Sequence, residues 1–329
     1  MSAEMTPPAA RAPRAPVANL GAVLRFGSRY AFPLAVLVLV VIGLVGFPAF
    51  RTATNVRNIL ESSSVLLLVA LGQTLVVLSR GADLSVGSMV GLSGAVFAYL
   101  YTNGTSQLLA ILGALALGLA IGALVNGLLI TKAKISFLIV TLGTFSILAS
   151  QANVVLDGNA VVVDSTLLTD VANNQVLGIP AIFAVAFVVY LALILVTRCT
   201  GYGRALYAVG SNPVAARLSG VAVDRVLIIT FGLCSLLSAL AGILTVGQLG
   251  SSQTTAGVGL ELQSIAAVLV GGTRFSGGYG SMTKTLIGVL FLGVLNNLLL
   301  IVGLSSFWQQ TFAGLVLIVA VGVDRTRED

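Results

Sequence analysis

The groups best suited to chemistry in this chain are two carboxylates beside glycine-rich breaks in apolar sequence. Asp83 lies in the segment Gly81–Ser88, and Glu261 precedes the break at Gly271–Ser281. An ionised carboxylate in the middle of a bilayer costs roughly 2.5–3.5 kcal/mol, so each needs a partner or a place near the surface. Asp83 and Ser85 therefore predict either a capped turn at the start of a helix or a hinge that gates a pathway. A proton relay through Asp83 or Glu261 is a further alternative.

Uncharged polar side chains are scattered through the other apolar stretches. In lipid they must face the protein interior, where they either form hydrogen bonds between helices, worth roughly 0.6 kcal/mol each, or line a wet, neutral pathway. Such a pathway suits a polyhydroxylated solute better than an ion. The pathway candidates, together with Asp83 and Ser85, are Gln73, Asn126, Thr141, Thr144, Gln248 and Asn296. Glu61 and Glu261 lie near the predicted outer ends of spans and are either solvated or able to contact a partner there.

Several kinds of chemistry are excluded by composition. The chain has no histidine and only two cysteines, Cys199 and Cys234, so it offers neither His-based catalysis nor a plausible metal site. The segment Gly271–Ser281 is rich in glycine, but it lacks the Gly-Lys-Ser/Thr ending of a phosphate loop. We expect it to be a flexible inner loop that packs beside the short helix Pro213–Ser219, which is described next. No nucleophile and base pair is visible, which argues against an enzyme.

A basic segment, Arg198–Arg225, is enclosed by apolar sequence on both sides. It predicts two short helices, Tyr202–Val209 and Pro213–Ser219. Asn212 is a favourable N-cap, Pro213 suits the first helical position and Gly220 follows the end. A helix this short is only marginally stable alone, so it would depend on what it docks against. It is either an ordinary basic loop or a coupling element pressed by another protein.

The elements that must position these residues are membrane spans. Of 329 residues, 57% are hydrophobic and 9% are charged, whereas soluble domains average about 25% charged. The fold class is therefore an all-α, polytopic membrane protein. The sequence predicts about ten spans, of which the third and eighth are short and glycine-rich. These candidates are Phe32–Phe50, Ser63–Ser79, Val86–Thr102, Gln107–Ile130, Ile135–Leu156, Ile179–Thr197, Val226–Leu249, Leu260–Thr273, Thr285–Gly303 and Phe307–Val323.

The distribution of charge predicts the orientation. With both termini in the cytoplasm, all of the 17 basic residues except Arg51 and Arg57 lie on the inside. The loop Asp157–Gly178 then lies outside, and it contains no Lys or Arg. We expect a disordered cytoplasmic tail over residues 1–29, a transmembrane domain over 30–324 with its cytoplasmic loop at 198–225, and a short cytoplasmic tail at 325–329.

Taken together, several motifs carry a resemblance that covers about Asn55–Asp324. They are Gly72-Gln73-Thr74, Gly81–Ser88, Asn126-Gly127, Thr141–Thr144, Tyr207–Pro213 with Ala215-Ala216-Arg217 and Gly220, Glu261-Leu262-Gln263, and Ile265-Ala266-Ala267 to Gly271-Gly272-Thr273. With these motifs the chain resembles the permease subunits of bacterial monosaccharide ABC importers of the ribose type. The resemblance implies the ABC importer permease fold, location in the bacterial inner membrane, and import of a monosaccharide or related polyol.

The resemblance also implies partners. These are a cytosolic ABC ATPase that binds ATP and Mg²⁺, a periplasmic or lipid-anchored sugar-binding protein, and a second permease copy. This chain would hold no cofactor and no metal. The resemblance places the ATPase-coupling residues at Asn212, Pro213, Ala215, Ala216, Arg217 and Gly220, and leaves Glu61 and Glu261 as candidate contacts of the binding protein. A permease of the branched-chain amino-acid type and a proton-coupled secondary transporter remain alternatives.

Overall fold

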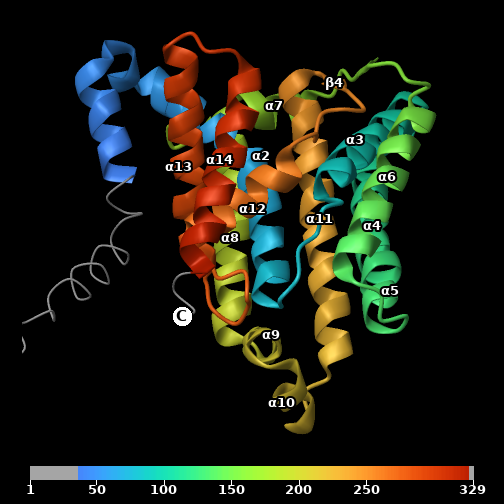
Figure 1. Cartoon of the computed structure of the whole chain (residues 1–329). Coiled ribbons are helices and arrows are strands. Elements are labelled where there is room, and N and C mark those ends of the chain that lie inside the picture. The colour runs from blue at the N-terminus through green and yellow to red at the C-terminus, as the bar shows by residue number, and fades with distance from the viewer. Residues whose placement is uncertain (1–35, 326–329) are drawn as a thin grey trace, which may run out of the picture.

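The computed structural model describes residues 36–325, which form a bundle of helices (Figure 1). The predicted tail at residues 1–29 lies outside the described part, and so does the end of the chain after Arg325. Within residues 36–325, six helical stretches are long and apolar enough to cross a membrane. They are α2 (Ala53–Leu78), the run formed by α4 (Gln107–Ala120), η2 (Ile121–Gly127) and α5 (Leu128–Thr131), α6 (Phe137–Val155), α8 (Ala181–Cys199), α11 (Val223–Leu249) and α13 (Met282–Ile301).

Further apolar helices complete the bundle. Those shorter than a full span are Val36–Gly46, α3 (Val86–Thr102) and α12 (Leu260–Val270), and α14 (Ser306–Arg325) ends the described chain. The all-α, multi-span class predicted from composition is confirmed, while the count of ten spans stays a prediction. Two expected boundaries were wrong. The first helix ends at Gly46 because Pro48 opens a 3₁₀ turn, Pro48–Arg51. The second begins ten residues early, at Ala53, because Thr52 caps it by accepting a hydrogen bond from the Asn55 N–H.

The two short, glycine-rich spans meet inside the bundle. The chain leaves α2 at Leu78 and re-enters as an extended segment before α3 begins, and it likewise re-enters after α11 before α12 begins (Figure 1). At the meeting point a side chain on Gly257 would overlap the carbonyl of Gly87, and one on Gly91 would lie 2.8 Å from the Thr254 oxygen. Glycine is therefore needed here for backbones to approach closely.

Helix α11 is the central support of the molecule. It packs along α2, α3 and α4, and small residues allow these close contacts. A Cβ on Gly72 of α2 would lie 3.0 Å from the Cα of Cys234, and one on Gly122 would overlap the Phe231 carbonyl. Gly122 belongs to η2, a π-helical turn that widens the run α4–η2–α5 where α11 packs against it. Leu67, Leu71 and Phe231 are fully or almost fully buried in the resulting core.

The two ends of the bundle differ. At one end lie the short helix α7 (Thr166–Asn173) and two small antiparallel sheets, which pair β1 (Val161–Val162) with β4 (Ser251–Ser252) and β2 (Gln175–Val176) with β3 (Ile179–Pro180). Leu177 and Gly178, both with positive φ, form the two-residue turn between β2 and β3. At the opposite end α9 (Gly201–Ser211) and α10 (Pro213–Leu218) project beyond the long helices (Figure 1).

Candidate functional site

The two projecting helices form because their sequence supplies caps at the right places. The hydroxyl of Thr200 accepts a hydrogen bond from the Gly203 N–H at 3.2 Å and so begins α9. The Asn212 side chain accepts from the N–H groups of Val214 and Ala215, both at 3.0 Å, and begins α10. Pro213 occupies the first helical position, and Gly220 follows with φ +83°. The predicted caps of α10 are thus confirmed, although the helix ends one residue earlier than expected.

Helix α10 presents an apolar surface at the tip of the molecule. Val214 and Leu218, one turn apart, are 68% and 85% exposed, whereas Ala216 on the other side is buried. This surface lies at the far end from the strands and beyond the long helices (Figure 1). An exposed apolar pair on a helix that cannot be stable alone is suited to binding another protein.

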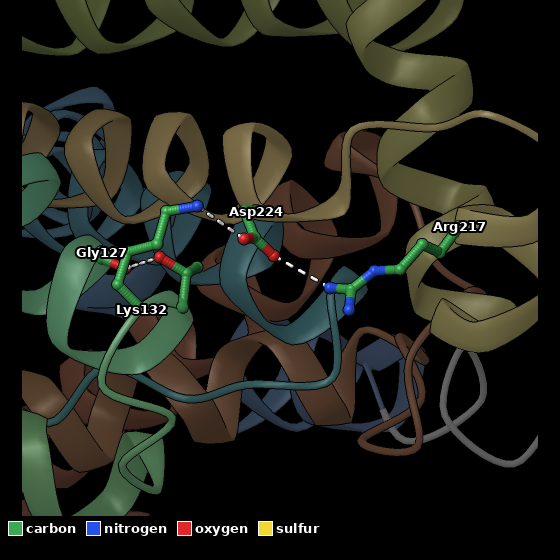
Figure 2. Close-up of polar contacts among 5 residues, drawn as sticks. Gly127, Lys132, Arg217 and Asp224 are labelled. Atoms are coloured by element: carbon green, nitrogen blue, oxygen red, sulfur yellow. Dashed lines mark hydrogen bonds and ion pairs between the residues drawn. The ribbon is translucent and has the colours of Figure 1, made fainter.

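An ion-pair cluster joins α10 to the bundle. Asp224, in the first turn of α11, accepts from Arg217 of α10 and from Lys132 after α5, each at 2.9 Å (Figure 2). Figure 2 shows the carboxylate lying between the two cations, which approach it from opposite sides. The side chains of Lys132 and Arg217 are about two-thirds exposed, at 65% and 66%. Solvent therefore screens the cluster, which links α10, α11 and the α5–α6 turn without fixing them strongly.

A second, tighter junction joins α9 to α2 and to the loop Gly271–Ser281. Arg80, just after α2, donates to the carbonyls of Gly210 at 2.6 Å and Ser211 at 2.5 Å. The Gly278 N–H donates to the Leu78 carbonyl at 2.9 Å. A side chain on Gly210 would overlap that carbonyl, so glycine is needed at this crossing. The loop expected to be flexible thus packs against the end of α9.

Tyr207 adds a further link between α9 and the same loop. Its hydroxyl donates to the Gly280 carbonyl at 3.0 Å. Burial raises the pKa of the Tyr207 hydroxyl, so the neutral, donating form persists at physiological pH. Helix α9 is also tied to α11, because the hydroxyls of Tyr202 and Thr230 lie 2.9 Å apart. Helix α9 is therefore linked by hydrogen bonds to α2, α11 and the loop.

Five of the predicted pathway residues meet in a buried network in the middle of the bundle. The Asp83 carboxylate accepts from both the N–H, at 2.9 Å, and the hydroxyl of Ser85. Asn126 of η2 donates to Ser85 Oγ at 3.1 Å and more weakly to Asp83 Oδ2 at 3.4 Å. The hydroxyl of Thr144 on α6 donates to the Asn126 oxygen at 2.7 Å. With its nitrogen turned toward the Asp83 carbonyl, the Gln73 amide bonds to both backbone groups of Asp83, at 3.1 and 3.3 Å.

The hydrogen bonds at the start of α3 differ from those of an ordinary N-cap in one respect. Ser85 occupies the N-cap position of α3, but its side chain makes no capping bond and instead donates to Asp83. The carboxylate thereby closes an Asx turn that ends the extended segment. All of these side chains are buried, and every polar atom named has a partner, which supports the interpretation of a fixed turn.

The remaining predicted residues lie elsewhere. The Thr141 hydroxyl is buried and bonds within α6 to the Phe137 carbonyl. Gln248, near the end of α11, donates to the backbone of Glu61 at 3.2 Å. Glu261 is partly buried: its carboxylate accepts from the Gly259 N–H, and Oε2 lies close to Gly87. Asn296 lines a separate cavity at the strand-bearing end.

Comparison with known proteins decides the family. The sequence profile described as "branched-chain amino acid transport system / permease component" matches residues 55–321. The chain belongs to this permease family. It is 42% identical over 299 residues to the ribose import permease protein of Escherichia coli (strain K12), covering 90% of this chain and 93% of that protein. No solved structure was found to match it.

Two further relatives extend the similarity. The ribose import permease protein of Bacillus subtilis (strain 168) is 39% identical over 299 residues, covering 89% of this chain and 92% of that protein. The D-allose transport system permease protein of E. coli (strain K12) is 33% identical over 302 residues, covering 91% and 92% respectively. With its apolar helices, the permease is a multi-pass protein of the bacterial plasma (inner) membrane.

Sequence reasoning missed several residues that the structure brings to the projecting end of the permease. Nothing in the sequence singles out Asp224, Lys132 or Arg80, because their partners lie 7 to 131 residues away along the chain. The positive φ of Arg80, +68°, was equally invisible in the sequence. A usable signal existed for α10, since Val214 and Leu218 are spaced one helical turn apart.

Proposed function

We propose that this permease is the membrane subunit of an ABC importer for a monosaccharide or related polyol, driven by a separate ATPase. In this proposal it has ten spans, with both termini in the cytoplasm, and works as a homodimer. A periplasmic or lipid-anchored binding protein delivers the solute, and the ATPase binds ATP and Mg²⁺. The relatives named as ribose and D-allose permeases support the class of solute.

The observation that carries the coupling role is the surface of α10. Val214 and Leu218 expose an apolar pair at the projecting tip, beside the cation Arg217. In the orientation predicted from charge this tip lies in the cytoplasm, where it can dock into the ATPase. Asn212 caps the helix, Pro213 begins it and Gly220 follows its end, whereas Ala216 packs toward the bundle and Ala215 is exposed.

The contacts of α9 provide a path for the motion. When ATP closes the ATPase, α10 moves with it, and α9 carries the displacement to α2 through Arg80 and to α11 through Tyr202. The ion pairs of Asp224 hold α10 to α11 in one state and can exchange with solvent in another. A switch between outward-open and inward-open pathways needs two discrete arrangements of this kind.

An amino acid is the competing solute, because the matched family is described by branched-chain amino acids. A zwitterion would require charged partners along its pathway. The polar network around Asp83 contains one carboxylate, and its hydrogen bonds are already made by Ser85 and Asn126. Uncharged amides and hydroxyls otherwise dominate the polar positions, and they suit a neutral polyol. We therefore assign a sugar.

The docking role is tested with Leu218→Glu. We expect the variant to lose association with the ATPase in detergent while its own thermal unfolding is unchanged, because Leu218 makes few contacts within the chain. The matched control is Leu177→Glu, which alters a leucine that is 98% exposed at the opposite end. Equal association of Leu218→Glu and the wild type would refute docking through α10.

The transport role is tested in proteoliposomes that contain the permease, the ATPase and the binding protein. We expect ATP-driven uptake of D-ribose or D-allose rather than L-leucine, and we expect Arg217→Glu to separate ATP hydrolysis from uptake. Uptake of L-leucine alone would assign the amino-acid class. Uptake by the permease alone under a pH gradient would instead establish a secondary transporter.

A further inference from the structure

A cavity of about 500 Å³ lies between α2, α12, α13 and α14, at the end of the bundle that carries the strands. Its volume falls within the roughly 300–1,000 Å³ of small-molecule sites in proteins. Each of the four helices contributes side-chain amides or hydroxyls. The principal ones are Asn55, Ser63, Gln263, Asn296, Asn297 and Gln309.

The amides of Asn55 and Asn297 form the wall between α2 and α13. Each donates to the other, at 3.0 and 2.8 Å, so this pair is satisfied and rigid. By contrast, among the described residues the side-chain amides of Gln263, Asn296 and Gln309 have no hydrogen-bond partner. They offer both donors and acceptors to a molecule in the cavity.

Ser63 marks the floor of the cavity. Its side chain is only 1% exposed, and its hydroxyl has no hydrogen-bond partner among the described residues. A side chain on Gly293 of α13 would overlap that hydroxyl, so glycine is needed where α13 packs directly against it. A buried, unpaired hydroxyl is costly, and rotation of the Ser63 side chain toward the cavity would let a ligand hydroxyl satisfy it.

The charges of the lining residues indicate which class of ligand fits the cavity. No described residue that lines it is acidic or basic, so nothing there compensates an ion. Apolar side chains, among them Leu66, Leu260 and Ile301, form the larger part of its accessible lining. Amides that donate and accept, set between apolar surfaces, match a neutral polyhydroxylated ring, whose hydroxyls form hydrogen bonds and whose C–H faces pack on apolar side chains. We propose that this cavity is a binding site for a monosaccharide within the permease itself.

This inference rests on the proposed import of a sugar and adds a place where the solute binds on its way. In the orientation predicted from charge, the cavity lies on the outer side, where the solute is delivered. A site that passes its ligand onward must bind it weakly, so we expect half-saturation at millimolar sugar.

The permease carries its own reporter for this site. Trp308 is the single tryptophan of the chain and directly precedes Gln309, which lines the cavity. The experiment titrates the full-length permease in lipid nanodiscs with D-ribose, followed by Trp308 fluorescence and by ligand-observed NMR. Saturation by D-ribose and no competition by D-ribose 5-phosphate are expected.

Two variants and a control locate the binding. Ser63→Ala removes one hydrogen bond, so we expect affinity to fall about fivefold while the ligand-free protein unfolds at the same or a higher temperature. Asn296→Leu should lower affinity at least tenfold. The control, Asn153→Leu, alters an exposed amide on α6 whose only hydrogen bond among the described residues is to its own helix, and should bind like the wild type.

The results separate the site from the function. If D-ribose gives no saturable signal while the same preparation, with ATPase and binding protein, imports D-ribose, the cavity is not a sugar site and the import function stands. Equal affinity of wild type, Ser63→Ala and Asn296→Leu would also overturn the site. If the complete system imports no sugar, the proposed function itself is wrong.

Discussion

Gly210 lies where α9 crosses the end of α2, and replacing it by alanine tests the junction directly. The new methyl group would overlap the Leu78 carbonyl and lie 2.6 Å from the Gly278 nitrogen. Overpacking at a rigid contact costs about 1–3 kcal/mol, and the displaced Gly278–Leu78 hydrogen bond adds roughly 1 kcal/mol. If α9 moves away to relieve the overlap, the two Arg80 bonds to Gly210 and Ser211 lengthen as well. We therefore expect Gly210→Ala to weaken the junction by about 2–4 kcal/mol.

The consequence for transport should exceed the consequence for folding. The new methyl group meets only the last residue of α2 and the loop Gly271–Ser281, so Gly210→Ala should insert in the membrane and bind the ATPase while ATP hydrolysis no longer drives uptake. The assay compares ATP hydrolysed per solute imported in proteoliposomes. Gly143→Ala is the matched control, because a Cβ at Gly143 meets no atom within 4 Å. If Gly210→Ala hydrolysed as much ATP per imported solute as the wild type, the view that this crossing transmits motion would be refuted.

Three further predictions address the other contacts. Asn212→Ala removes the acceptor of two N–H groups and should destabilise α10 by about 1 kcal/mol, seen as faster hydrogen exchange in Pro213–Leu218 with no change elsewhere. Asp224→Asn removes both exposed ion pairs and should lower the free energy of unfolding by less than about 1 kcal/mol, while making the coupling ratio insensitive to salt; a large loss of stability would contradict a screened cluster. Asn126→Leu leaves Asp83 and Thr144 short of partners and should lower the thermal stability by the equivalent of about 2–3 kcal/mol, whereas Asn153→Leu should not.

Much of the fold could be predicted from local sequence, because adjacent residues show how long each apolar stretch is and where glycines interrupt it. The positions of α3, α11 and α12 agree with the predicted spans to within three residues. The predicted start of α2 was wrong because its first turns carry Asn55, Asn58 and Glu61. A membrane span predicted from consecutive apolar residues leaves such polar turns out. Those turns are helical because Thr52 caps them and because Asn55 pairs with Asn297 across the bundle.

The sites were harder to predict, because their contacts join distant parts of the chain. Asn126 and Thr144 were chosen only as polar residues in apolar spans, and nothing in the sequence indicates that Asn126 would reach Asp83 or that Thr144 would bond to Asn126. The π-helical turn that directs Asn126 inward also has no sequence signature that was recognised. Asn212 was predictable, because a cap acts on residues two and three positions away.

The contrast between the two polar clusters indicates where the permease can switch. Around Asp83 the side chains are buried and mutually bonded, so opening that network would leave several groups without partners at once, each at roughly 1–3 kcal/mol. Around Asp224 the partners are exposed, and water can replace each ion pair at a cost below about 1 kcal/mol. A motion driven from the ATPase side should therefore break the Asp224 contacts first and carry the Asp83 turn as a rigid unit. The glycine-rich contact between the segments before α3 and α12 would then stay fixed, while α9 and α10 move.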